Sequence, residues 1–172
     1  MPEFLHDDAR FSAEPVLSEL AAFEWAHGLA FDATDAPQLS FNDLAAVPPE
    51  DWADISFIQH PSLHLVTPNW NVVVIWHAHH DGAALPEAVS SEQANVIAVW
   101  RNDYKSYFRT LEGDESLLWQ ALSNGTGFGD ACAELAATTN MSDEEAPQRA
   151  AQLLRNWIKD GWIQSYEIPQ TD

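Results

Sequence analysis

Apolar residues recur at helical spacing near the start of the chain, at Val16, Leu20 and Phe23. This spacing is typical of an amphipathic helix. We expect the helix to run from residue 15 to about residue 35, with Ser12 as a candidate cap. Beyond it the pattern predicts only short elements up to residue 69. These are helical turns over residues 40–46 and 48–52 and extended segments around Ile55, Phe57, Leu63 and Leu65.

A β-branched and aromatic run, WNVVVIWHAHH, occupies residues 70–80 and predicts a strand. Residues 95–101 (NVIAVWR) and 105–112 (KSYFRTLE) predict two more strands. Asn102-Asp103 between them is a turn signal, so we expect these two strands to form an antiparallel hairpin.

After Gly113 the apolar spacing becomes helical. Asp114 is a candidate cap for a first helix, and residues 128–137 predict a second. Ser142 and Glu145 have the form of a capping box that opens a third helix, with Gly161 as its C-cap. Residues 162–168 then predict a returning strand or wing.

These elements predict an α+β fold. We expect an N-terminal helical segment over residues 1–69, followed over residues 70–172 by a small antiparallel sheet and a winged helix-turn-helix. Charge supports two modules with different surfaces, because residues 1–94 carry 1 cation and 15 acids, whereas residues 95–172 carry 6 cations and 12 acids.

The composition limits the partners that the chain can have. Its 172 residues carry 27 acids against 7 lysines and arginines, a formal charge of −20. A surface this acidic repels phosphate backbones and anionic lipid, so we expect no nucleic-acid or membrane partner. The single cysteine, Cys132, excludes an internal disulfide and favours a small buried side chain. The N-terminus does not resemble a secretory signal, and we expect a cytoplasmic protein.

Histidines near residue 80 raise the possibility of a metal site. If residues 70–80 form a strand, His77 and His79 share a face, and His80 and Asp81 follow directly. The alternative is a strand end that enters a wet loop, where histidine is common. We favour the loop, and keep a metal-binding or hydrolytic protein as a second alternative.

The long N-terminal helix carries a different kind of candidate. Glu24, Asp32 and Asp35 could act as paired carboxylates, but a solvated helix face explains them more simply. Glu24 stands beside Trp25, and a large aromatic on such a face is typical of a partner-binding surface.

The C-terminal cations indicate a peptide groove. The 105–111 strand could lie at a sheet edge, where an extended peptide adds as a further strand, with the 148–159 helix beside it supplying apolar pockets and cations. Such a groove suits a peptide with acidic and apolar residues. The candidate peptide-binding residues are Lys105, Tyr107, Arg109, Leu111, Arg149, Gln152, Arg155 and Lys159.

A DNA-binding regulator is the first alternative, because a winged helix permits it. The candidate recognition helix carries Arg149, Arg155 and Lys159, but Glu144, Glu145 and Asp160 balance them.

Six segments, in order, carry a resemblance to a known family: PVLSELAAFEWAHGLAFDATDA, HPSLHLV, WNVVVIWHAH, VWRN with YFRTLE, and LLWQALSNGTGFGDACAELA. With them the chain resembles the HvfC/BufC family of partner proteins in the maturation of ribosomally made peptides, which is related to MbnC. Family members carry an additional N-terminal helical region before the PEFL-like segment with which this chain begins. We therefore expect either a short member or a truncated one.

The resemblance implies a non-catalytic adaptor. It would pair with a TIM-barrel enzyme that holds several iron ions, and present the cysteines of a precursor peptide for conversion into copper-binding oxazolone or thiooxazole groups. The C-terminal part would act as a recognition element for the leader of that peptide. Iron would sit in the enzyme, so we expect no metal or cofactor in this chain. The residues that would face the enzyme are Glu24, Trp25, His60, Trp76 and His77.

Overall fold

The computed structural model describes residues 2–8, 10–11, 13–91 and 95–169. The chain forms two compact units, and each is assembled from two separate stretches of sequence. Unit 1 contains Met1–Ala33 and His64–Leu111, and unit 2 contains Thr34–Leu63 and Glu112–Asp172. The sequence had suggested a single division near residue 69. The observed division is discontinuous, because residues 34–63 pack with the C-terminal helices.

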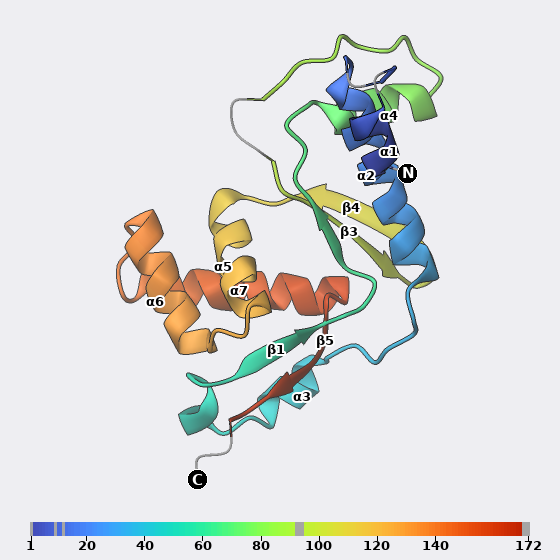
Figure 1. Cartoon of the computed structure of the whole chain (residues 1–172). Coiled ribbons are helices and arrows are strands. Elements are labelled where there is room, and N and C mark those ends of the chain that lie inside the picture. The colour runs from blue at the N-terminus through green and yellow to red at the C-terminus, as the bar shows by residue number, and fades with distance from the viewer. Residues whose placement is uncertain (1, 9, 12, 92–94, 170–172) are drawn as a thin grey trace. The chain divides into compact units, whose positions relative to one another are not determined.

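Unit 1 places helices on a three-stranded antiparallel sheet of strand order β2-β3-β4 (Figure 1). Its core joins α2 to the sheet through Phe23, Ala26 and Ala30 of the helix and Ile97 and Val99 of β3. At the end of α2, Arg101 of β3 donates a hydrogen bond to the carbonyl of Phe31 (2.8 Å). The elements of unit 1 are α1 (Pro2–Asp7), α2 (Pro15–Asp32), β2 (His64–Val66), α4 (Val72–His80), β3 (Ile97–Asn102) and β4 (Lys105–Thr110).

The prediction of a strand over residues 70–80 is wrong. Most of this segment forms helix α4. Its β-branched residues favour a strand only where they can pack on a sheet surface, so its composition alone does not decide between strand and helix. Val72 and Ile75, about one helical turn apart, are the buried positions of this helix, and Val74 between them is exposed. The packing of that face therefore overrides local propensity.

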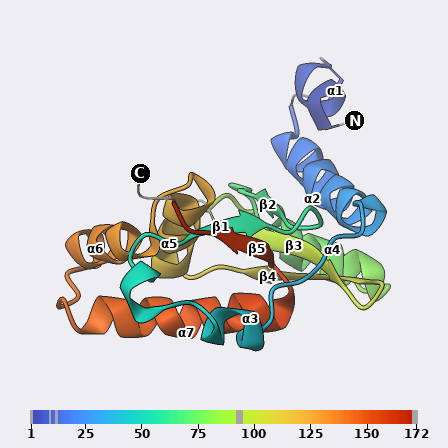
Figure 2. The same ribbon diagram turned by 90° about the horizontal axis from the view of Figure 1, so that it is seen from below.

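Unit 2 consists of helices and a two-stranded antiparallel sheet in which β5 lies along β1 (Figure 2). Phe57 faces Tyr166 across this pair, and a bulge follows at Ile58 and Gln59. The elements of unit 2 are α3 (Phe41–Ala45), the 3-10 helix η1 (Pro49–Asp51), β1 (Ser56–Gln59), α5 (Gly113–Ser123), α6 (Phe128–Thr139), α7 (Glu145–Asp160) and β5 (Ile163–Glu167).

Most predicted helices and the hairpin are confirmed. The reciprocal bonds of the predicted capping box are present, because Glu145 accepts a hydrogen bond from the Ser142 amide while the Ser142 hydroxyl accepts one from the Glu145 amide. They lie just before α7, whose N-cap is Glu144. Gly161 ends α7 in the left-handed conformation (φ 76°). Asp114 lies inside α5 rather than at its N-cap, which is Glu112. Ser12 lies outside the described residues.

Three tryptophans form the centre of unit 2. Trp119 packs edge-on against both Trp157 and Trp162, with ring centroids 4.9 and 5.4 Å apart. The indole Nε1 of Trp157 donates to the carboxylate of Glu115 (2.8 Å), which is itself buried. A polar group buried in this way needs such partners. The pair therefore fixes α5 against α7.

Helices α5, α6 and α7 followed by β5 match the order expected for a helix-turn-helix and a wing, but β5 pairs with β1, a strand more than 100 residues earlier. The fold is thus mixed helix and antiparallel sheet, as predicted. Among the described residues, no helix combines the length and apolar character needed to cross a membrane.

Replacing Gly161 by Ala should destabilise the protein. Its left-handed backbone costs about 1–2 kcal/mol for a residue with a Cβ, and that Cβ would also meet the side-chain amide of Gln38. Urea denaturation measures the loss. Adding Gln38→Ala should restore only the stability lost through the contact with Gln38. If it restores all of the lost stability, the left-handed backbone at residue 161 does not contribute.

Candidate functional site

Strand β4 is an edge strand. Within the described part of the chain it pairs with β3 and with no other strand. Its backbone on the side away from β3 is therefore the sheet margin at which a further strand can add. This is the edge on which the sequence had suggested peptide binding.

A two-residue turn fixes which backbone groups of β4 point away from β3. Asp103 and Tyr104 both adopt positive φ (47° and 60°), as tight hairpins require, and Asn102 pairs with Lys105 on either side. Leu111 donates to the carbonyl of Val96 (2.8 Å) at the other end of the hairpin. Hydrogen-bonded and non-bonded pairs alternate along an antiparallel ladder. The outward backbone groups of β4 consequently belong to Ser106, Phe108 and Thr110.

The side chains of β4 alternate between two faces. Tyr107 is half-exposed and stacks on Trp100 of β3, with ring centroids 5.9 Å apart. Lys105 and Arg109 lie on the same face as Tyr107. Phe108 points the other way and packs edge-on against Phe23 of α2 (5.0 Å). The edge thus presents two cations and an aromatic ring together.

Leu111, also predicted to contact a peptide, is buried. Only 7% of Leu111 is exposed, so its side chain belongs to the core of unit 1 rather than to the exposed face. This prediction assumed that an apolar residue on the strand would line the groove.

The cations of α7 fall into two groups. Arg149 is ion-paired with both Asp114 and Glu112, and its guanidinium holds the pKa of Asp114 below the usual carboxyl range. It therefore fixes α7 to the start of α5. Gln152, Arg155 and Lys159 recur at i, i+3 and i+7, and all are exposed on one face of α7. These α7 residues belong to unit 2, whereas the β4 residues belong to unit 1.

The residues predicted to face a partner separate in the structure. Glu24 and Trp25 are exposed on α2, and Trp25 is 54% exposed. His60 belongs to unit 2 and is only 3% exposed, with its ring nitrogens 2.8 Å from the Ser62 hydroxyl and 3.3 Å from the Ala36 carbonyl. Both ring nitrogens therefore have partners within unit 2.

Trp76 is the centre of an aromatic stack that sequence reasoning missed. The rings of His27 of α2 and His80 of α4 both stack on the Trp76 ring. Their centroids lie 5.5 and 4.7 Å from that of Trp76, with interplanar angles of 4° and 14°. His77 meets Phe108 at 5.5 Å. Burial lowers the pKa of His27, whose Nε2 has no hydrogen-bond partner among the described residues. Burial therefore favours a neutral His27 ring.

The geometric basis of the proposed histidine metal site is wrong. On helix α4, His77 and His79 are about 200° apart around the axis, so they do not share a face. Within the described residues, no group of three or more His, Cys, Asp or Glu side chains is placed to hold a metal ion.

Helix α2 is apolar on both of its sides. Phe23, Ala26 and Ala30 are buried, yet Trp25, Leu29 and Phe31 on other faces are exposed. Gly28 lies among these exposed residues in the helix interior, where glycine costs about 1 kcal/mol relative to alanine. A Cβ at Gly28 would meet nothing within 4 Å, so the fold described here does not require glycine.

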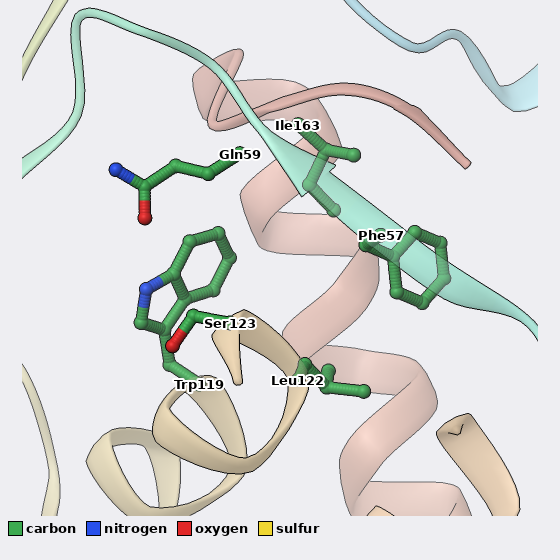
Figure 3. Close-up of a pocket in the computed structure, with 6 residues that line it drawn as sticks. All are labelled: Phe57, Gln59, Trp119, Leu122, Ser123 and Ile163. Atoms are coloured by element: carbon green, nitrogen blue, oxygen red, sulfur yellow. The ribbon is translucent and has the colours of Figure 1, made fainter. Parts of the chain in front are cut away.

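The enclosed space in unit 2 does not suit a ligand. Figure 3 shows a hollow between α5 and the β1–β5 sheet, lined by Phe57, Gln59, Trp119, Leu122, Ser123 and Ile163. Its volume of about 10 Å³ admits nothing larger than a water molecule. Cys132 is buried, as predicted, and burial raises the pKa of its thiol, which opposes reactivity.

Comparison with protein-family models, with curated proteins and with solved structures gives no match.

Acid should destabilise unit 1 through His27. Its pKa in the fold is below the unfolded value of 6.5, so the unfolded chain takes up the proton first and stability falls as the pH drops below about 6.5. His64, whose pKa is also lowered by burial, adds in the same direction. Urea denaturation at pH 7.5 and 5.5 measures the fall.

His27→Phe is the matched control, because it keeps a ring between Phe23 and Trp76 without a titratable group. The variant should lose less stability between the two pH values. An identical fall in both proteins would contradict the assignment to His27.

Proposed function

We propose that this protein is a non-catalytic adaptor that binds the leader of a ribosomally made precursor peptide by strand addition at β4. It then presents the cysteines of that peptide to a TIM-barrel enzyme with several iron ions, for maturation into a copper-binding product. The observation that carries the proposal is the margin of β4 that pairs with no strand of the described residues, together with Lys105, Tyr107 and Arg109 on one face of this strand. The enzyme, its iron ions and the copper-binding product are inferred from the resemblance to the HvfC/BufC family.

Charge supports an acidic and apolar leader. The chain has only seven lysines and arginines, and two of them, Lys105 and Arg109, fall on this one edge strand. Main-chain hydrogen bonds would supply affinity, and alternate side chains of the peptide would reach the Tyr107 face. An acidic peptide would meet attraction here and repulsion over most of the remaining surface.

The finer fold proposal is that α5, α6, α7 and β5 of unit 2 act as a winged helix of the leader-recognition type. The order of these elements and the exposed face with Gln152, Arg155 and Lys159 support it. Because Arg149 is engaged with Asp114 and Glu112, only Arg155 and Lys159 of the predicted α7 cations remain on that exposed face. This weakens the alternative of DNA recognition, which needs several phosphate contacts.

Proline substitutions test strand addition. Ser106→Pro or Thr110→Pro removes an outward N–H and spares the bonds to β3, so leader affinity should fall about tenfold, the worth of roughly one hydrogen bond. The probe is a set of labelled peptides made from the N-terminal halves of short Cys-containing reading frames beside the gene, measured by fluorescence anisotropy.

Ser106→Ala and Thr110→Val keep the outward N–H groups and should bind like the original protein. Tyr107→Pro should instead disrupt the hairpin, visible as lost circular dichroism, because its N–H points toward β3. If Ser106→Pro and Thr110→Pro bind the leader with unchanged affinity, the leader does not add as a strand at β4.

Charge reversal tests the cationic face. Lys105→Glu and Arg109→Glu should each weaken binding of an acidic leader about tenfold, with a shallower salt dependence. Arg10→Glu is the matched control, since Arg10 is an exposed cation on α1–α2 paired with Asp8. Equal losses in all three variants would indicate a general effect of net charge instead.

A further inference from the structure

We propose that the outward side of α2 is a docking surface for a cationic helix of a partner protein, and that this helix crosses α2 at Gly28. The inference deepens the proposed function, because it names the chemistry of the surface by which the adaptor would hold a partner protein. It concerns a different part of unit 1 from the β4 edge.

Glycine gives this surface its shape. Gly28 lies on the outward side, about one turn after Trp25, and the space beyond its Cα is open. The absence of a side chain lets a second helix approach the α2 backbone closely, since the distance between packed helices depends on the side chains at their contact. Close packing of a partner helix would then compensate for the stability that glycine at position 28 costs α2.

The flanking residues are suited to binding. Trp25 and Leu29 are 54% and 43% exposed and stand one turn apart. A large aromatic beside an aliphatic residue is typical of the centre of a protein interface. From Ala21 to Phe31 the only polar side chains are Glu24 and His27, so this stretch of α2 is more apolar than one buried face requires.

Charge selects the partner. Glu24 and Asp32 are exposed on this same face, one turn before and one turn after Gly28, and α2 contains no lysine or arginine. A second copy of α2 crossing antiparallel at Gly28 would bring Glu24 of one chain toward Asp32 of the other, and the like charges would repel. A helix with lysine or arginine on either side of an apolar stripe meets both carboxylates favourably.

The experiment uses a synthetic amidated helical peptide built of repeated Ala-Lys-Leu-Ala-Ala-Lys-Leu units, with a matched peptide in which Glu replaces Lys. Calorimetry should show that the lysine peptide binds the intact protein and the glutamate peptide does not. Gly28→Leu and Trp25→Ala should each weaken binding about tenfold or more. Amide chemical-shift changes should map to residues 21–32.

Stability separates docking from a merely structural role. Gly28→Leu should raise the melting temperature by about 2–4 °C, because leucine favours helix more than glycine, while it weakens binding. Gln148→Leu, an exposed helical position in unit 2, should leave binding unchanged. The proposal is overturned if Gly28→Leu binds the lysine peptide like the original protein, if the glutamate peptide binds as well, or if neither binds.

The leader-peptide assay on the same Gly28→Leu protein keeps the two proposals distinguishable. Normal leader affinity together with lost lysine-peptide binding supports docking at α2 independently of β4. Failure of all leader peptides, with lysine-peptide binding intact, would overturn the β4 proposal alone.

Discussion

The two-residue turn at Asp103 and Tyr104 is the constraint on which unit 1 depends. Its left-handed residues leave one register for β3 and β4, and a slip by one residue would exchange the two faces of β4. The same register packs the partly buried Phe108 against Phe23 of α2 and turns the amides of Ser106, Phe108 and Thr110 away from β3. Core packing and the availability of the edge therefore follow from one local geometry.

Sequence reasoning predicted the elements whose signals are local. The hairpin, the Ser142–Glu145 box and the Gly161 cap depend on neighbours a few residues away, and the structure contains all three. It failed where tertiary packing decides, as in α4, where burial of Val72 and Ile75 sets the conformation. The pairing of β5 with β1 joins distant segments, and no local pattern announces it.

The candidate site shows the same division. Alternation along β4 was enough to group Lys105, Tyr107 and Arg109, but not to show that Leu111 belongs to the core or that Arg149 is held by Asp114. Both depend on contacts made by other elements. Gly28 could have been noticed earlier, since a glycine inside an apolar helix is unfavourable unless something beyond propensity favours it.

The discontinuous make-up of the two units has a consequence for synthesis on the ribosome. Unit 1 is incomplete until Leu111 has emerged, and by then residues 34–63 have already been made without the helices on which they pack. Strand β1 has to wait for β5, which is translated more than 100 residues later. During that interval β1 is a nascent strand without its partner, and such a strand is the kind of segment that chaperones protect.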